Sequence, residues 1–245
     1  MKLLIDIGNT RLKWAAWRDG RRITGGVFAH RETPLDVALS SNWTSLQRPA
    51  AILVASVVGE DLERQLAAFI AAQFSCQPEF VRSPAAALGI TNAYAQPHRL
   101  GVDRFLALAA LHAAAPRAQI LIGCGTALTL DALAADGRHL GGLIAPSPTL
   151  MRQALNGATS RIGDSAGAVV EIAANTSDAA HSGCILAAIA LIERFRREVG
   201  ERLGTEPALT GDGGGFDECM AFLPGAERGR DLVLRGLALW SERES

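Results

Sequence analysis

The sequence lacks the features that mark several classes of protein. Its 245 residues carry a formal net charge of −1, whereas proteins that bind nucleic acid or an anionic membrane need a clustered positive field. The four cysteines form no CxxC pair, and no histidine cluster completes a metal site around them. This pattern fits reduced thiols in a cytosolic protein.

Long apolar runs are also missing. The alanine-rich stretch 105–133 is interrupted by His112, Pro116 and Gly123, whereas a membrane-spanning helix needs about 20 consecutive apolar residues. Met1 leads almost directly into a predicted strand, without the pattern of a signal peptide. We therefore expect a soluble, cytoplasmic protein whose partners include neither nucleic acid nor a membrane.

The chain does have the material for a large buried core. Hydrophobic residues make up 49% of it and charged residues 20%, a balance typical of globular proteins and not of disordered ones. A chain of this length fits one large domain or two modest ones.

One glycine-centred turn occurs twice, at residues 5–10 (IDIGNT) and 122–127 (IGCGTA). Each copy ends one apolar run and enters another. Glycine lets the backbone approach a phosphate closely, with its N–H groups turned inward. Two such hairpins can clamp a polyphosphate, so the repeat predicts a phosphotransferase with two similar lobes and a nucleotide between them.

The apolar patterns predict an α/β duplication, with lobes at residues 1–115 and 116–245. We expect strands in both lobes at 3–7, 12–17, 23–28, 50–57, 119–123, 127–133, 139–145 and 208–210. We expect helices after Pro34 and at 60–73, 105–115, 149–155, 179–199 and 231–240, and a long loop at 83–98.

Asp6 precedes the first turn and is a candidate metal ligand. A carboxylate at a strand end can hold Mg²⁺ directly or through water, as that ion prefers. An ordinary hairpin turn containing asparagine is the alternative for this short motif. The second copy of the turn, at Gly125 and Thr126, favours the phosphate-binding interpretation.

Asp103 and Arg104 stand ahead of an apolar helix. An aspartate there is a good N-cap, but a carboxylate at a helix start could equally accept a proton from an attacking hydroxyl. Arg104 could hold a carboxylate or phosphate through two hydrogen bonds. Spacing alone leaves both roles of Asp103 open.

Taken together, the segments resemble the type III pantothenate kinases. The resemblance covers almost the whole chain in the family's order, at residues 6–10 (DIGNT), 92–94 (NAY), 101–104 (GVDR), 125–127 (GTA), 141–146 (GGLIAP), 175–176 (NT), 210–212 (TGD) and 232–237 (LVLRGL). Turns of the first kind occur throughout the sugar-kinase, chaperone and actin-like superfamily. The segments at 92–94 and 101–104 point to this member.

The resemblance implies an actin-like ATPase fold, in which two RNase H-like α/β domains flank an interlobe nucleotide cleft. It implies a homodimer that transfers the γ-phosphate of ATP to the primary hydroxyl of pantothenate, giving 4′-phosphopantothenate, the first step towards coenzyme A. The cofactors it implies are Mg²⁺ and a monovalent cation, K⁺ or NH₄⁺.

The resemblance also assigns roles to individual residues. Asp103 would be the general base, and Asp6 would hold Mg²⁺ through water. ATP would contact Asp6, Ile7, Gly8, Asn9, Thr10, Arg11, Leu12, Lys13 and Thr126. The pantothenate pocket would be formed by Tyr94, Gly101, Val102, Asp103, Arg104 and Thr176.

Two departures from the family's pattern concern the second lobe. The family usually has aspartate two residues before the second glycine turn, where it helps to bind the monovalent cation, and this chain has Gly123. The cation site could be lost or could use other oxygens. The glycine-rich run 210–215 is looser than the family's Thr-Gly-Gly. We therefore give little weight to a nucleotide contact there and expect a flexible loop as the alternative.

Two other functions remain open. A related kinase could phosphorylate another hydroxyl, although residues 92–94 and 101–104 match the pantothenate pattern. A non-catalytic, nucleotide-binding regulator is supported by Gly123 alone, while Asp6, Asp103 and Arg104 are all present. Cys124, within the second turn, is expected to be a small buried hydrophobe and not a nucleophile.

Overall fold

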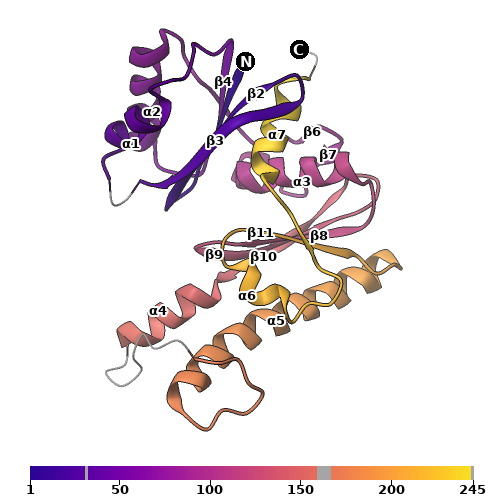
Figure 1. Cartoon of the computed structure of the whole chain (residues 1–245). Coiled ribbons are helices and arrows are strands. Elements are labelled where there is room, and N and C mark those ends of the chain that lie inside the picture. Colours follow the sequence, from indigo (N-terminus) through magenta and orange to yellow (C-terminus); the bar gives the residue numbers. More distant parts are fainter. Residues whose placement is uncertain (31–32, 159–166, 244–245) are drawn as a thin grey trace. The chain divides into compact units, whose positions relative to one another are not determined.

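The computed structural model describes residues 1–30, 33–158 and 167–243. The chain forms two compact units, and the first boundary falls between residues 115 and 116 (Figure 1). The second unit ends at residue 230, and the chain then returns to the first unit. Residues 231–243, which we expected in the second lobe, therefore pack with the first.

The first unit is built on a five-stranded sheet in the order β3-β2-β1-β4-β5. β1 pairs antiparallel with β2 and parallel with β4. The strands are β1 (Lys2–Ile7), β2 (Arg11–Arg18), β3 (Arg21–Ala29), β4 (Ala51–Ser56) and β5 (Glu79–Val81). The predicted meander and the buried strand after it are thus confirmed, with bounds that differ by one or two residues.

One face of this sheet is covered by α1 (Leu35–Trp43) and α2 (Glu60–Phe74) (Figure 1). Alternate residues of β1, including Ile5 and Ile7, enter the core beneath these helices together with Trp43. Because side chains alternate between the faces of a strand, Asp6 belongs to the opposite face.

That opposite face carries α3 (Val102–Ala114) and α7 (Leu232–Trp240), which contact β4 and β1 respectively. The two helices pack closely at Gly236, which has no side chain. A Cβ at this position would collide with the backbone of Leu106. Close packing of α7, whose residues are almost all apolar, explains why the C-terminal segment belongs to the first unit.

The second unit repeats the same strand order, β10-β9-β8-β11-β12. Its strands are β8 (Gln119–Cys124), β9 (Ala127–Leu133), β10 (His139–Pro146), β11 (Ala208–Asp212) and β12 (Glu227–Arg228). β8 pairs antiparallel with β9 and parallel with β11, just as β1 pairs with β2 and β4. The duplication that the repeated turn predicted is confirmed.

Helices α5 (Thr176–Leu203) and α6 (Phe216–Met220) pack on one face of the second sheet. α4 (Pro148–Ala158) lies beside α5 (Figure 1). α5 begins where the Asn175 side chain accepts the N–H of Asp178 at 2.9 Å, and it ends at Gly204 in the left-handed conformation. It is longer at both ends than the apolar pattern predicted.

Several short elements were not predicted. The expected loop at 83–98 contains the hairpin of β6 (Ala86–Ala87) and β7 (Ile90–Thr91), followed by the 3₁₀ helix η1 (Pro97–Arg99). α6 and β12 were also missed, because elements of two to five residues carry too little periodicity to be recognised.

Within the described ranges, no helix has the length and apolar character needed to cross a membrane.

Candidate functional site

The first glycine turn joins β1 to β2. Gly8 donates its N–H to the carbonyl of Arg11 at 3.0 Å, which closes the turn. The ring Nε2 of His30, the residue after β3, lies 2.7 Å from the Gly8 carbonyl oxygen, and the His30 backbone N–H donates to the Thr10 carbonyl at 3.3 Å. His30 therefore braces the turn. No sequence pattern indicated this contact, which depends on the register of β3 against β2.

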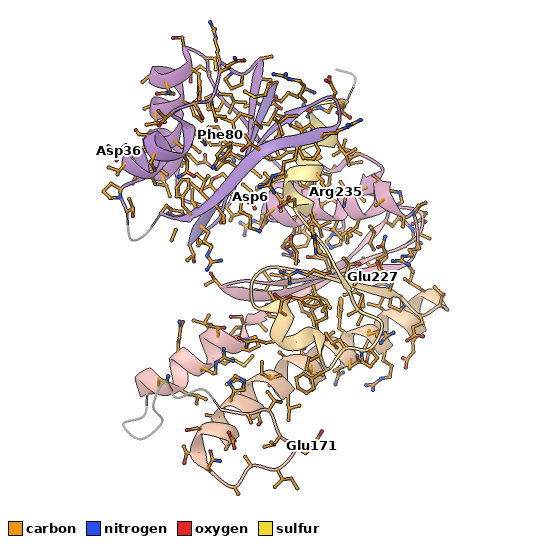
Figure 2. All side chains as sticks on the ribbon, viewed as in Figure 1. Asp6, Asp36, Phe80, Glu171, Glu227 and Arg235 are labelled. Atoms are coloured by element: carbon orange, nitrogen blue, oxygen red, sulfur yellow. The ribbon has the colours of Figure 1, made fainter. Side chains whose placement is uncertain are left out.

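Asp6 lies near the end of β1, in register with Lys13 on β2 and Ala55 on β4. Its carboxylate is half-buried and belongs to the sheet face opposite α1 and α2 (Figure 2). A carboxylate held at a strand end beside a glycine turn fits the ligand set that Mg²⁺ takes through its waters. Lys13 brings a positive charge to the adjacent strand position.

The second glycine turn is shorter. Gly125 donates its N–H to the carbonyl of Ala127 at 3.0 Å, so that only Gly125 and Thr126 lie between β8 and β9. Both residues are exposed. The exposed hydroxyl and the glycine backbone are the groups that phosphate binding at a turn requires.

The glycine-rich run that we expected to be a flexible loop packs against this second turn. Residues up to Asp212 belong to β11, and Gly215 donates its N–H to the Cys124 carbonyl at 3.0 Å. Gly213 has a φ of +96°, and a side chain there would collide with the Cys124 backbone. The glycines therefore permit close approach of two backbones, a role that loop composition alone did not reveal.

Cys124 is fully buried, as expected for a small hydrophobe. Its thiol forms a hydrogen bond with the buried Cys219 thiol of α6, and this bond, together with burial, raises the pKa of Cys124 well above its ordinary value. A thiol that stays protonated is a poor nucleophile. The structure thus supports a packing role.

The candidate pantothenate residues of the first unit come together at the start of α3. Arg104 is 8% exposed; its Nη1 donates to the Tyr94 hydroxyl at 3.3 Å, and its guanidinium carbon lies 6.0 Å from the Tyr94 ring centroid. The Asn92 side chain holds the backbone before Tyr94 in place. Its Oδ1 accepts the Tyr94 N–H at 3.0 Å, and its Nδ2 donates to the carbonyls of Pro84 and Pro97 at 3.1 Å.

Asp103 is not the N-cap of this helix. α3 begins at Val102, its N-cap position is Gly101 without a side-chain cap, and Asp103 is the second helical residue. The half-buried Asp103 carboxylate accepts the N–H of Arg104 at 2.8 Å. A side chain at Gly101 would crowd this carboxylate. Asp103 is thus held at the helix start, near the partial positive charge that the backbone N–H groups of the first turn carry.

Thr176 is the first residue of α5 in the second unit, and it is exposed. The helix start is fixed by Asp178, whose carboxylate accepts the N–H of Ala168 and a side-chain N–H of Asn175, both at 2.7 Å.

Among the described residues, no group of three or more His, Cys, Asp or Glu side chains is arranged to hold a metal ion.

Comparison with protein families identifies a family for this chain. The profile of the type III pantothenate kinases matches residues 2–198. A type III pantothenate kinase of Xanthomonas campestris pv. campestris (strain 8004) is 42% identical over 238 residues, which cover 97% of this chain and 96% of that protein. The type III pantothenate kinase of Xanthomonas axonopodis pv. citri (strain 306) is 41% identical over 242 residues, covering 99% and 98%.

Solved structures agree at the level of the fold. A conserved Campylobacter jejuni protein, assigned provisionally to the Baf family of transcriptional activators, has a TM-score of 0.64 at 19% identity, covering 98% of both chains. The activator of 2-hydroxyisocaproyl-CoA dehydratase from Clostridium difficile, solved with bound ADPNP, has a TM-score of 0.51 at 13% identity, covering 98% of this chain and 93% of that one. With the duplicated sheets, these similarities establish the predicted actin-like ATPase fold.

Proposed function

This chain belongs to the type III pantothenate kinase family, and from that premise we propose that it transfers the γ-phosphate of ATP to the primary hydroxyl of pantothenate. The observation that carries the proposal is the group at the start of α3, where Asp103 and the buried Arg104 lie beside Tyr94. The product is 4′-phosphopantothenate, which makes the reaction the first step towards coenzyme A.

The two glycine turns are proposed to bind the phosphates of ATP. In the first, residues 6–13 supply backbone N–H groups, the side chains of Asn9 and Thr10, and the positive charge of Lys13. In the second, Thr126 supplies an exposed hydroxyl. Phosphoryl transfer depends mainly on positioning and on neutralising the charge of the phosphates, which these groups provide.

Asp6 is proposed to hold Mg²⁺ through water, because its half-buried carboxylate stands at the strand end beside the first turn. The bound ion would neutralise charge on the β- and γ-phosphates. The monovalent cation is also part of the proposal, but Gly123 offers no carboxylate to it.

Asp103 is proposed to be the general base. The substrate hydroxyl oxygen attacks the γ-phosphorus, the bond from that phosphorus to the β,γ-bridging oxygen breaks, and ADP leaves with the bridging oxygen. The hydroxyl proton passes to the Asp103 carboxylate, which must be ionised to accept it. Arg104 is proposed to bind the pantothenate carboxylate through its planar guanidinium, beside Tyr94, Gly101 and Val102, with Thr176 as a further contact.

We also propose that the protein is a cytoplasmic homodimer. An apolar groove of about 690 Å³ between α4 and α5 supports association through the second unit, and it is lined by Leu150, Met151, Leu155, Ala180 and Cys184 among others. Leu150 and Leu155 are each 37% exposed, and exposed apolar surface of this kind is typical of protein interfaces. Analytical ultracentrifugation of Leu150→Asp against wild type tests this; an unchanged dimer would place the interface elsewhere.

The deciding experiment is ADP release from ATP and Mg²⁺, with and without pantothenate, for wild type, Asp103→Asn and Asp36→Asn. Asp36 is the matched control because it is the second residue of α1, as Asp103 is of α3, and it lies on the exposed surface of that helix (Figure 2). We expect pantothenate-dependent release that falls about 10²- to 10⁴-fold in Asp103→Asn and is unchanged in Asp36→Asn.

The same experiment separates the alternatives. Release that depends on another hydroxyl compound, and not on pantothenate, would make the protein a kinase of different specificity. Folded wild-type protein that binds ATP but releases no ADP with any acceptor would instead favour the non-catalytic regulator, for which Gly123 is the supporting feature.

A further inference from the structure

Gly123, Thr129 and Asp212 are neighbours on three adjacent strands of the second unit. Gly123 on β8 pairs with Thr129 on β9 and, on its other side, with Asp212 on β11. Side chains of paired residues point to the same face of a sheet. A hydroxyl and a carboxylate therefore flank a residue that has no side chain, on the face opposite α5 and α6.

The internal duplication shows what this arrangement replaces. β1 and β8 are the central strands of the two sheets, and Asp6 and Gly123 each stand two residues before the glycine of their turn. In the first unit the parallel neighbour of Asp6 is Ala55, whereas in the second unit the neighbour of Gly123 is Asp212. The second unit thus carries its carboxylate one strand away, a displacement of about 4.8 Å.

The Thr129 side chain occupies the space above Gly123. A side chain built on Gly123 would collide with Oγ1 of Thr129, so this hydroxyl leans over the glycine. The Asp212 carboxylate is held at the end of β11 because its Oδ1 accepts the Gly213 N–H at 2.7 Å. Thr129 and Asp212 are both half-buried, and both stand beside the turn that contains Thr126.

We propose that the Asp212 carboxylate and the Thr129 hydroxyl bind a monovalent cation beside the second glycine turn, in place of a carboxylate at position 123. The proposal rests on the kinase function proposed above. One carboxylate balances the charge of one monovalent ion, and the Thr129 hydroxyl supplies a neutral oxygen in place of one water of its shell. Mg²⁺, which keeps its waters and binds through carboxylates and phosphates, fits Asp6 better.

The test measures cation-dependent stability as well as activity. The melting temperature is recorded with Mg²⁺ and AMPPNP in KCl and in choline chloride of equal ionic strength, for wild type, Asp212→Asn and Asp136→Asn. The amide at position 212 can still accept the Gly213 N–H, so only the charge is removed. Asp136 is the control because its carboxylate also accepts a backbone N–H, from Arg138, in the turn at the opposite end of β9.

We expect KCl to raise the melting temperature of wild type and of Asp136→Asn in a saturable manner. In Asp212→Asn the concentration of KCl that gives half of this rise should increase by about 10- to 100-fold, as for the loss of one charged ligand. The assignment is overturned if Asp212→Asn keeps the potassium response of wild type. It is also overturned if wild type shows no potassium response.

Two further measurements keep the proposal decidable. If circular dichroism shows that Asp212→Asn does not fold, Thr129→Val keeps the shape of the side chain without its hydroxyl and should weaken the potassium response in the same direction. Pantothenate-dependent ADP release by wild type is measured in the same buffers. Release without any potassium response overturns the cation site alone, whereas a potassium response without release contradicts the kinase function alone.

Discussion

The guanidinium of Arg104 donates a hydrogen bond to the hydroxyl of Tyr94 at 3.3 Å, across ten residues of sequence. Arg104 is one of the few charged residues that the structure buries, and its guanidinium also lies within cation–π distance of the Tyr94 ring. Each side chain therefore fixes the position of the other, at the start of α3 beside Asp103.

Removing this contact should weaken pantothenate binding more than it slows the chemical step. We expect Tyr94→Phe to raise the KM for pantothenate about fivefold, the equivalent of roughly 1 kcal/mol for one hydrogen bond, with little change in kcat. Arg104→Lys keeps the charge but loses the planar fork, so its effect should be larger. Steady-state kinetics checks both; an unchanged KM with a reduced kcat in Tyr94→Phe would contradict the binding role.

A side chain at Gly123 should destabilise the second unit. In Gly123→Ala the new Cβ would collide with Oγ1 of Thr129, whose branched side chain has few rotamers to choose from. We expect a loss of about 1–3 kcal/mol in the free energy of unfolding, as for other overpacked sites. Gly125→Ala is the matched control, because its Cβ would meet nothing within 4 Å. Urea denaturation measures both, and equal stability of the two variants would show that Thr129 moves aside.

Thiol reactivity should separate Cys76 from the other cysteines. Cys76 is partly exposed, whereas Cys124, Cys184 and Cys219 are buried. Burial also raises the pKa of the Cys184 thiol, and only a thiolate reacts rapidly. We expect iodoacetamide to modify one thiol quickly in folded protein and all four in denaturant, as counted by mass spectrometry. Rapid modification of Cys124 in the folded state would contradict its packing role.

The start of α5 should loosen in acid. The N–H of Ala168, followed by the side chain of Asn175, lowers the pKa of Asp178. Because the folded state favours the ionised form, Asp178 stabilises this segment above its unfolded pKa of about 3.9 and loses that contribution as the pH falls through the lower folded value. Hydrogen exchange should show Ala168 protected at neutral pH in wild type and less protected in Asp178→Asn.

Equal protection of Ala168 in the two proteins would show that the Asp178 carboxylate does not hold the segment. Ser182 offers an internal reference, because its hydroxyl accepts the N–H of Val170 at 2.9 Å and does not titrate in this range. Protection of Val170 should therefore depend much less on pH than protection of Ala168.

The duplicated fold could be predicted from the sequence because its signals are local. The two glycine turns and the alternating apolar runs around them identified both meanders, and the segment at 101–104 identified the start of α3 within a few residues. The roles proposed for Asp6, Thr126 and Thr176 stay predictions, because each role is a contact with a bound ligand.

The interpretations that failed depended on contacts distant in sequence. We expected residues 231–240 to belong to the second lobe, but the apolar α7 packs on β1 and α3 of the first unit. We expected a flexible loop at 210–215, but Gly213 and Gly215 lie against Cys124, about ninety residues earlier. The composition of a segment restricts the conformations that it can adopt. The residues that it packs against decide which of these conformations it adopts.

The sequence by itself therefore determined the secondary structure around each turn, the repetition of that pattern and the family. Each of these depends on residue types at short, fixed spacing. Only the tertiary structure decided that His30 braces the first turn, that Gly101 and not Asp103 caps α3, and that Asp212 and Thr129 flank Gly123. These relationships arise from strand register and helix packing, which bring together residues that no short spacing connects.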